Sequence, residues 1–332
     1  MENEAGVNRN MLLAGDIGGT KTLLGVFDPT TARPRPLAVR SFVTPDYPDL
    51  PAIVAAFLAM DEAQGLEIDR ACFGVAGPVI GDTAELTNVP WRVDAARVAR
   101  VHAIGRVRLL NDLQAMAYSI PVLHEDETHV LQRGEPLRGG NIALIAAGTG
   151  LGEALLHNVE GRFIPSASEA GHSDFSARTD REIALLRALT ARHGRVEVER
   201  VISGRGISNI HRVLHRGPCA AGIDPDDPES PRAISAAALE GRCADCVATL
   251  DLFVDAYGAE AGNLALRVVA TGGVFIGGGI APKILPALER GSFIAAFRAK
   301  SPLESLLAAM PVKVILNAQA GLLGAAVYAA EL

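Results

Sequence analysis

One pattern occurs twice in this chain: an apolar run, a turn rich in glycine, and a second apolar run. The two segments are MLLAGDIGGTKTLLGVF, residues 11–27, and NIALIAAGTGLGEALLH, residues 141–157, and their glycine turns coincide when they are aligned. Short apolar runs on either side of a glycine turn predict a strand, a turn and a second strand. The recurrence therefore predicts two similar halves, each opening with such a hairpin, with the two turns facing one another across a cleft.

The first of these turns, GDIGGTKT, has much of the P-loop pattern, which needs Gly, four residues and Gly-Lys-Ser/Thr before a helix. Here Thr20 stands where the second glycine belongs, and LLGVF followed by DPTTARPRP suits a strand and a break better than a helix. The segment is therefore not predicted to be a P-loop. Backbone N–H groups in a glycine turn can bind an anion without any helix, so the two turns are candidates for the halves of a phosphate clamp.

Strands and helices alternate along the rest of the chain, which favours an α/β fold. The sequence predicts a helix over residues 51–65, a capped helix after Thr179, and a long helical stretch over about residues 233–270. A third glycine turn follows a strand in VFIGGGIAPK. The chain ends with the strand VKVIL and an alanine-rich helix, which we expect to fold back on the first domain.

Composition excludes several classes of protein. The 332 residues are 49% hydrophobic and 21% charged, as in globular proteins, and suffice for two domains. The net charge of −7 argues against a nucleic-acid surface, and it requires that bound phosphate be held by local dipoles and metal. No run approaches the roughly 20 apolar residues of a membrane span. The start, MENEAGVNRN, has no signal core, so we expect residues 1–10 to be a disordered tail on a cytoplasmic protein.

Four cysteines, Cys72, Cys219, Cys243 and Cys246, are too few for a disulfide framework in a chain of this size. The CADC pair has the spacing of half a zinc site, but a second pair or nearby histidine ligands would be needed, and none is visible in the sequence. The pair also falls in a helix-prone run. The sequence therefore disfavours a metal at these cysteines.

Polar residues in the glycine turns suggest a chemistry. Asp16 can hold a hydrated Mg²⁺, because this hard cation prefers carboxylate oxygen and keeps several waters. Thr20 and Thr149 can donate their hydroxyls to phosphate oxygens. Asn111 and Asp112 end an apolar strand, where ligands of α/β sheets bind, although either residue could simply cap the next helix.

Three further polar residues, Glu169, His172 and Glu199, have two possible interpretations. Each could lie in a solvated surface loop. Together with the Asn-Asp pair they could instead bind a neutral polyol, because each sugar hydroxyl both donates and accepts a hydrogen bond.

Eight ordered segments of the chain resemble the bacterial glucokinases of the hexokinase, sugar-kinase and actin-like ATPase superfamily, from about residue 11 to the C-terminus. They are GDIGGTKT, TNVPW, LLNDLQAMAYSIP, AAGTGLGEA, SEAGHSDF, ERVISGRG, GGVFIGGGIAPK and AGLLGAA. The resemblance implies a two-domain α/β fold of the actin-like ATPase (ribonuclease H-like) type, with duplicated βββαβα halves and an interdomain cleft. We expect residues 11–122 and 313–332 to form a small domain and residues 123–312 a large one.

The same resemblance implies an enzyme that uses ATP to phosphorylate glucose at its 6-hydroxyl, with Asp112 as general base. It implies domain closure on sugar binding, a small-molecule sugar as partner, and a homodimer. Asn111, Glu169, His172 and Glu199, with Asp112, correspond to sugar contacts. The residues implied to hold ATP are Gly15, Asp16, Ile17, Gly18, Gly19, Thr20, Gly148, Thr149 and Gly150 at the phosphates and Gly278 and Gly279 beside adenosine, with Asp16 holding Mg²⁺ through water.

Two alternatives stay open from the sequence: a kinase of another hexose or amino sugar, and a non-catalytic sugar-sensing regulator on the same fold. A polyphosphate donor in place of ATP is a further possibility, which the adenosine-side segment GGVFIGGGIAPK disfavours. The sequence departs from the pattern of this family at two places. Glu153 adds a carboxylate just after the second glycine turn, where a small or apolar residue would repel phosphate less. The zinc-binding cysteine cluster of the related repressor-and-kinase branch is absent.

Overall fold

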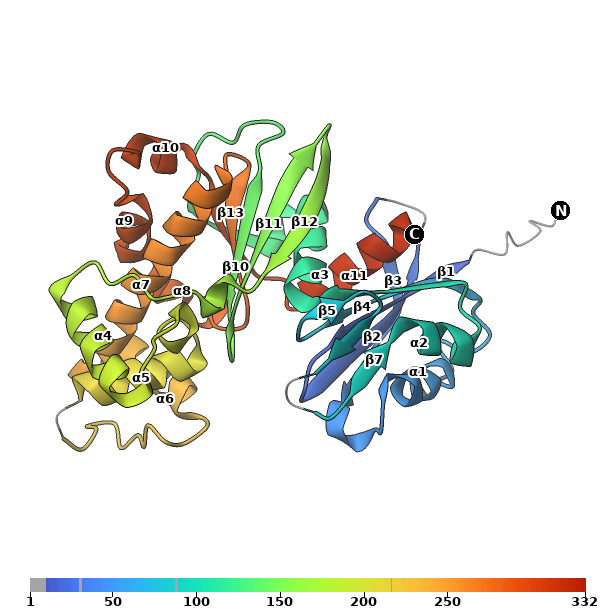
Figure 1. Cartoon of the computed structure of the whole chain (residues 1–332), viewed down its shortest axis with the longest axis horizontal. Coiled ribbons are helices and arrows are strands. Elements are labelled where there is room, and N and C mark those ends of the chain that lie inside the picture. The colour runs from blue at the N-terminus through green and yellow to red at the C-terminus, as the bar shows by residue number, and fades with distance from the viewer. Residues whose placement is uncertain (1–9, 30–31, 87–88, 216) are drawn as a thin grey trace. The chain divides into compact units, whose positions relative to one another are not determined.

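The structure is a computed structural model that describes residues 10–29, 32–86, 89–215 and 217–332 (Figure 1). The chain divides into two compact units. Unit 1 contains the described residues up to His124 together with Asn317–Leu332, and unit 2 contains Glu125–Leu316. Residues 1–9 of the expected disordered tail, and residues 87 and 88 of the TNVPW segment, lie outside the described residues.

The main sheet of unit 1 has the strand order β3-β2-β1-β4-β8. Strands β1 and β2 form an antiparallel hairpin with Ile17 opposite Thr22, and β4 and β8 run parallel to β1. A strand, not a helix, follows the first glycine turn, which confirms that the turn is not a P-loop. The strands are β1 (Met11–Ile17), β2 (Lys21–Asp28), β3 (Arg35–Val43), β4 (Ile68–Val75) and β8 (Arg106–Asn111), and a small second sheet contains β5 (Val79–Ile80), β6 (Thr83–Glu85) and β7 (Arg92–Asp94).

Helices cover both faces of this sheet. Successive side chains of a strand point to opposite faces, so one strand contributes to two apolar clusters. Leu13 and Ile17 of β1 belong to one apolar cluster with residues of α1 and α2, whereas Leu12 and Ala14 belong to another with residues of α3 and α11. The C-terminal helix thus packs on unit 1, as predicted. These helices are α1 (Leu50–Leu58), α2 (Ala95–His102), α3 (Asp112–Ser119) and α11 (Ala320–Glu331), with the 3-10 turns η1 (Thr44–Asp46) and η2 (Ile120–Val122).

The helix predicted over residues 51–65 is shorter than expected: α1 ends at Leu58, and residues 59–65 form turns. The reason is that the buried side chains of α1 end at Phe57. The residues that follow, Asp61 and Glu62 among them, are mostly exposed, so packing does not extend the helix.

The sheet of unit 2 has the strand order β12-β11-β10-β13-β14-β9. Its first five strands repeat the pairing of unit 1: an antiparallel β10–β11–β12 meander, with β13 and β14 parallel to β10. This confirms the predicted duplication, to which β9 adds an antiparallel edge strand. The strands are β9 (Thr128–Gln132), β10 (Ile142–Ala147), β11 (Leu151–Val159), β12 (Arg162–Ser168), β13 (Gly273–Gly277) and β14 (Val312–Ile315).

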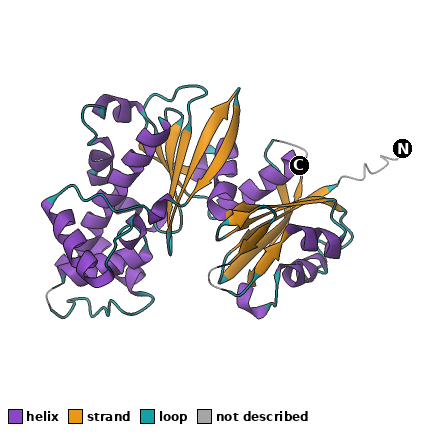
Figure 2. Ribbon diagram, in the orientation of Figure 1, coloured by secondary structure: helices purple, strands orange, loops and turns teal. Residues whose placement is uncertain are grey.

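The helices of unit 2 lie beside its sheet and surround the long helix α7 (Figure 2). Helix α4 begins with the predicted capping box of Thr179 and Glu182 and ends at Gly194. The helices are α4 (Asp180–His193), α5 (Gly204–Leu214), α6 (Ser230–Leu239), α7 (Ala244–Val268), α8 (Leu285–Leu288), α9 (Ser292–Arg298) and α10 (Glu304–Ala309), with the 3-10 turns η3 (Glu125–Glu127), η4 (Ala170–His172), η5 (Val198–Arg200) and η6 (Ala281–Ile284).

The long helical stretch predicted over about residues 233–270 is helical, but it is not continuous. It is two helices, because α6 ends at Leu239 and α7 begins at Ala244, with Cys243 as its N-cap. Gly241 lies between them with φ +68°, a backbone conformation that cannot continue a helix. The CADC pair therefore lies at the start of a helix and not inside one. Within the described residues, no helix has the length and hydropathy needed to cross a bilayer.

Candidate active site

The first glycine turn, residues 18–20, joins β1 to β2 at the carboxyl end of β1. The Gly18 N–H donates to the Lys21 carbonyl at 3.0 Å, and the Thr44 hydroxyl donates to the Gly18 carbonyl at 2.8 Å. The Thr44 N–H donates to the Thr20 carbonyl at 3.0 Å. The turn is thus held by Lys21 and Thr44, and Thr20 at its tip is exposed. Gly15 and Ile17, also expected at the phosphates, are buried within β1.

Asp16 lies in β1 just before this turn and is partly buried. Burial raises the pKa of its carboxyl, and the positive charge of Lys21 acts in the opposite direction. A Cβ added to Gly321, in the first turn of α11, would lie 3.0 Å from Oδ2 of Asp16. The missing side chain at 321 therefore leaves the space that the carboxylate needs. Gly321 lies in the AGLLGAA segment, but the sequence carried no sign that it serves Asp16.

Asn111 and Asp112 lie at the junction of β8 and α3. Asn111 is the N-cap of α3: its Oδ1 accepts from the N–H groups of Leu113 at 2.9 Å and Gln114 at 3.4 Å, and its Nδ2 donates to the Gly77 carbonyl at 3.2 Å. Asp112 is the first residue of α3, and its Oδ1 accepts from the Leu113 N–H at 2.9 Å. Asn111 therefore caps α3, which was one of its two predicted roles. Its amide group has a second N–H that can donate to a ligand.

Parallel pairing places these groups at one edge of the sheet. Asp16 pairs with Gly74 of β4, and Val75 pairs with Asn111 of β8. With neighbouring strands about 4.8 Å apart, two strand spacings separate Asp16 from Asn111 by about 10 Å across the sheet. Unit 1 therefore presents a glycine turn and two carboxylates at the carboxyl ends of adjacent strands, where α/β sheets bind ligands.

The second glycine turn, Gly148–Gly150, occupies the corresponding place in unit 2, and Glu199 of η5 contacts it. Oε2 of Glu199 accepts from the Leu151 N–H at 2.9 Å, and a Cβ added to Gly150 would lie 2.5 Å from the same oxygen. The Gly204 N–H donates to the Gly148 carbonyl at 2.8 Å. Glu199, which is expected to bind the sugar, therefore lies against the turn that is expected to bind the phosphates. Thr149, at the tip of this turn, is exposed.

Glu169 precedes the short turn η4 as its N-cap, and His172 is the last residue of η4. The N–H of His172 donates to the Glu169 carbonyl at 3.0 Å, and both residues are exposed. A bridge between Asp174 and Glu197 and a hydrogen bond from the Val198 N–H to the Ser173 carbonyl, 2.9 Å, join η4 to η5. The structure thus joins the two short segments that carry the three sugar-binding candidates of unit 2, which are 30 positions apart at most.

The third glycine turn, which contains Gly278 and Gly279, lies beside the second. It follows β13, which runs parallel to β10. Gly278 has φ +82°, and a Cβ added to it would lie 2.3 Å from the carbonyl oxygen of Ala147, the last residue of β10. Two neighbouring parallel strands of unit 2 thus end in adjacent glycine turns.

Glu153 does not extend toward these turns. Its carboxylate is fully buried against α7, where Oε2 lies 3.4 Å from Nη1 of Arg267, and Arg267 also pairs with Glu260 at 2.9 Å. Burial, and then the charge of Glu260, raises the pKa of Glu153 to about 8, against the pull of Arg267. The expected repulsion of phosphate by Glu153 is therefore wrong: the side chain points into the core, and at neutral pH it is mostly protonated.

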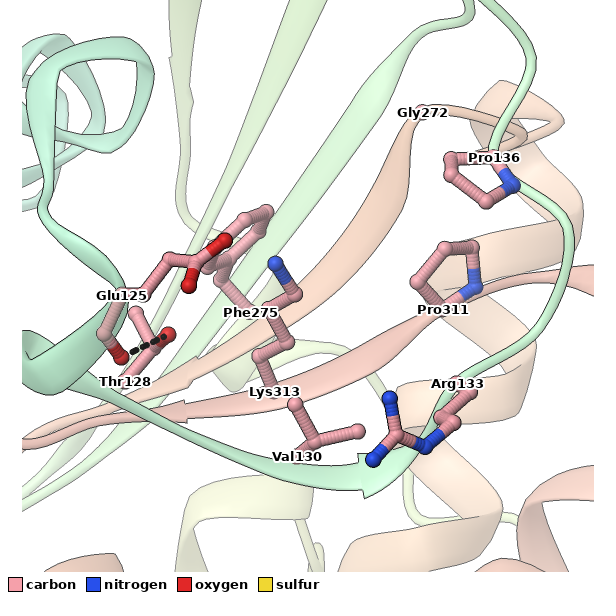
Figure 3. Close-up of a pocket in the computed structure, with 9 residues that line it drawn as sticks. All are labelled: Glu125, Thr128, Val130, Arg133, Pro136, Gly272, Phe275, Pro311 and Lys313. Atoms are coloured by element: carbon pink, nitrogen blue, oxygen red, sulfur yellow. Dashed lines mark hydrogen bonds between the residues drawn. The ribbon is translucent and has the colours of Figure 1, made fainter.

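Two cavities of unit 2 differ in their relation to the candidate residues. One of about 360 Å³ is lined by Glu199 with residues that include Arg200, Ser203 and Arg205. The other, of about 420 Å³, is lined by Glu125, Arg133, Phe275 and Lys313 among others, on β9, β13, β14 and the adjoining loops (Figure 3). None of the sequence-predicted site residues lines the second cavity.

Solved structures share this architecture. A glucokinase from an Antarctic psychrotroph has a TM-score of 0.86 and 30% sequence identity, over 97% of this chain and 99% of that one. A ROK-family glucokinase from Streptomyces griseus, solved with glucose and AMPPNP, has a TM-score of 0.65 and 22% identity, over 97% of this chain and 100% of that one. The duplicated sheets and their glycine turns thus define an enzyme of the class of sugar kinases with the actin-like ATPase fold.

Sequence comparison identifies the family within this class of sugar kinases. A family model described as Glucokinase matches residues 13–332. The glucokinase of Synechocystis sp. is 41% identical over 98% of this chain and 99% of its own length. The chain belongs to the glucokinase family, which confirms the resemblance found in its eight motifs.

Proposed function

We propose that this member of the glucokinase family transfers the terminal phosphoryl group of ATP to the 6-hydroxyl of glucose, giving glucose 6-phosphate and ADP. Family membership over residues 13–332 supports the reaction. The observation that supports the residue assignments is the contact of Glu199 with the second glycine turn. Glu199 is a candidate for sugar binding, and the turn it contacts is the one proposed to bind phosphate. This contact supports an arrangement in which the sugar binds next to the phosphates of ATP.

Asp112 is the proposed general base. Its carboxylate accepts the proton of the 6-hydroxyl as that oxygen attacks phosphorus, and it orients the hydroxyl beforehand. Oδ1 already accepts from the Leu113 N–H, which fixes the side chain at the start of α3. A carboxylate is a weak base at neutral pH, so in-line positioning and charge stabilisation by the turns supply most of the remaining acceleration.

Sugar binding is assigned to Asn111 and Asp112 of unit 1 and to Glu169, His172 and Glu199 of unit 2. Carboxylates accept from sugar hydroxyls, while the Asn111 amide and the His172 imidazole can donate to them, so the set matches a polyol. Because the assignment draws on both units, we expect them to move toward one another when sugar binds, excluding water that would otherwise accept the phosphoryl group. Small-angle scattering checks this: an unchanged radius of gyration with saturating glucose would contradict it.

ATP is assigned to the three glycine turns. The phosphates would contact the turn after Asp16 and the turn Gly148–Gly150, where N–H groups and the exposed hydroxyls of Thr20 and Thr149 can donate. Gly278 and Gly279 would lie beside the adenosine. The carboxylate of Asp16 fits a hydrated Mg²⁺, because this hard cation prefers carboxylate oxygen and Gly321 leaves space beside Oδ2. When bound, Mg²⁺ would neutralise charge on the transferring phosphates.

The contact between Gly321 and Asp16 gives a specific prediction. In Gly321→Ala the new methyl group would crowd Oδ2 of Asp16, so the carboxylate must shift by a few tenths of an ångström. We expect the Mg²⁺ concentration for half-maximal rate to rise about tenfold, because small displacements in an aligned site are costly. Alanine is the better helix former, so the melting temperature should not fall. Unchanged Mg²⁺ dependence would show that Asp16 has room to move or does not serve the metal.

The remaining assignments follow from the chemistry proposed. The acidic net charge of −7 supports a protein that binds neither nucleic acid nor a membrane surface. Because the proposed reaction consumes ATP and phosphorylates glucose, we place the protein in the cytoplasm, at the step by which glucose enters glycolysis. A homodimer is proposed from the family resemblance alone, and sedimentation equilibrium tests it.

A sugar panel tests the function. ATP turnover is measured by a coupled assay with glucose, mannose, fructose, galactose, N-acetylglucosamine and no sugar. We expect strong turnover with glucose and little with the others. Turnover with a different sugar would keep the mechanism but change the substrate, and sugar binding without turnover on any sugar would indicate a regulator.

A further inference from the structure

Three cysteines that are far apart in the sequence converge in unit 2, away from the residues assigned above. Cys219 lies in the loop after α5, Cys243 is the N-cap of α7, and Cys246 lies in its first turn. Sγ of Cys219 is 3.9 Å from Sγ of Cys243 and 3.8 Å from Sγ of Cys246. These distances are far longer than a disulfide bond, and all three cysteines are free.

The same distances match thiolates that share a metal ion. Two Zn–S bonds of about 2.3 Å at a tetrahedral angle place their sulfurs about 3.8 Å apart, and a Zn–N bond of about 2.0 Å places an imidazole nitrogen about 3.5 Å from a sulfur. Sulfur atoms in van der Waals contact have a similar spacing, so the histidine nitrogens that converge on the same sulfurs carry the argument for a metal. Each of two groups, one with His215 and one with His211, brings its ligand atoms within 4.8 Å of one another, and both include Cys219.

His215 is oriented as a ligand would be. Its Nδ1 lies 2.7 Å from the carbonyl oxygen of Gly217, which can only accept, so Nδ1 carries the proton and Nε2 of the neutral ring keeps its lone pair. Nε2 lies 3.9 Å from Sγ of Cys243 and 3.4 Å from Oδ2 of Asp245. A backbone carbonyl that fixes the far nitrogen is the usual support of a metal-binding histidine.

His211 is a second, independent sign of a ligand. It lies in the last turn of α5, four positions before the C-cap His215, and the two ring centroids are 4.6 Å apart. The residue is only 1% exposed, yet within the part of the chain that the structure describes neither ring nitrogen has a hydrogen-bond partner. A buried imidazole without a partner is costly, and the position of His211 beside Cys219 and Cys246 makes it an alternative ligand at the same cluster.

We propose that Cys219, Cys243, Cys246 and His215 bind one Zn²⁺ in a closed tetrahedral site, with His211 packed against it. Three thiolates and one imidazole form a set that selects Zn²⁺ over the hard cations that ATP uses. All four positions are filled by protein, so the site is structural and not catalytic. The expectation from sequence that no histidine lies near the CADC pair is corrected here: His215 stands four positions before Cys219, and the fold brings both to the pair.

The proposed site would connect three parts of unit 2. It joins the C-terminal end of α5, the loop after it and the N-terminal end of α7. The other end of α5 begins next to Ser203, whose hydroxyl donates to the Glu199 carbonyl at 2.7 Å. Binding of zinc would therefore hold the helix that supports the sugar-binding carboxylate, and its loss should loosen that region first.

The first test uses the full-length wild-type chain without a histidine tag. Protein expressed with added zinc should contain about one Zn²⁺ per chain after exhaustive dialysis. Protein stripped by a chelator under reducing conditions should bind one equivalent of Co²⁺ and show thiolate-to-cobalt charge-transfer absorption with the strong visible bands of tetrahedral Co²⁺. Absence of these bands at excess Co²⁺, or a disulfide among these cysteines in freshly prepared protein, would overturn the proposal.

Variants identify the ligands. Cys243→Ala and His215→Ala should each lower the zinc content at least tenfold and lower the melting temperature, whereas Cys72→Ala, which removes a buried thiol in unit 1, should keep about one Zn²⁺. Loss of zinc in His211→Ala with retention in His215→Ala would overturn the choice of His215. If a variant fails to fold, the wild-type cobalt spectrum alone decides. Because the site is independent of the proposed reaction, either can fail without the other.

Discussion

Asp112→Asn is expected to lower kcat for glucose phosphorylation by about 10²–10⁴-fold while glucose still binds, because general-base assistance is worth that much in rate. Asparagine keeps an oxygen at the Oδ1 position, which can still accept from the Leu113 N–H as Asp112 does at 2.9 Å. The start of α3 should therefore keep its conformation. The amide cannot accept the proton of the attacking hydroxyl, so the chemical step is lost. Initial rates in the coupled assay give kcat, and calorimetric titration gives the glucose affinity.

Asp94→Asn is a matched control. Asp94 is also an aspartate at a helix N-terminus in unit 1, where its Oδ1 accepts from the Arg97 N–H at 3.1 Å. Its substitution should cost about 1 kcal/mol of stability or less and leave kcat unchanged. A kcat of Asp112→Asn within threefold of wild type would rule out the general base. Loss of glucose binding along with rate would make Asp112 chiefly a sugar ligand.

Glu153→Gln is expected to make the protein more stable than wild type at pH 8 but not at pH 5. The folded chain holds the proton of Glu153 with a pKa of about 8, whereas the unfolded chain releases it near the ordinary value of 4.5. The wild type therefore loses stability as pH rises between these values, and glutamine, which does not titrate, does not. By linkage the difference in unfolding free energy should grow by about 3 kcal/mol from pH 5 to pH 8.

The measurement is urea unfolding of both proteins across this pH range. Glutamine also removes the carboxylate that Arg267 faces at 3.4 Å, but Arg267 keeps its closer partner Glu260 at 2.9 Å. Glu304→Gln, a substitution of an exposed glutamate in α10, should follow the wild-type pH profile. Parallel profiles for Glu153→Gln and wild type would mean that Glu153 is ionised in the folded protein and is compensated by Arg267.

Local patterns in the sequence predicted the parts of the structure that local chemistry decides. The two hairpins, the capping box of α4 and the duplicated order of strands are set by hydrophobic period, turn residues and caps, all of which act within a few positions. The length of α1 and the break before α7 were missed. In both cases a helix-forming composition continues past the point where burial or backbone conformation stops the helix.

Motifs alone thus determined the family, the glycine turns and the set of polar residues proposed to bind sugar and phosphate. Only the tertiary structure decided which of these residues touch: Glu199 against the second turn, Asp16 in the space left by Gly321, and Glu153 turned toward α7. It also gathered His215 and Cys219 at the CADC pair, more than 20 positions away. The physical reason is that spacing along a chain specifies contacts within a helix or hairpin, whereas contacts between elements depend on how their buried faces pack.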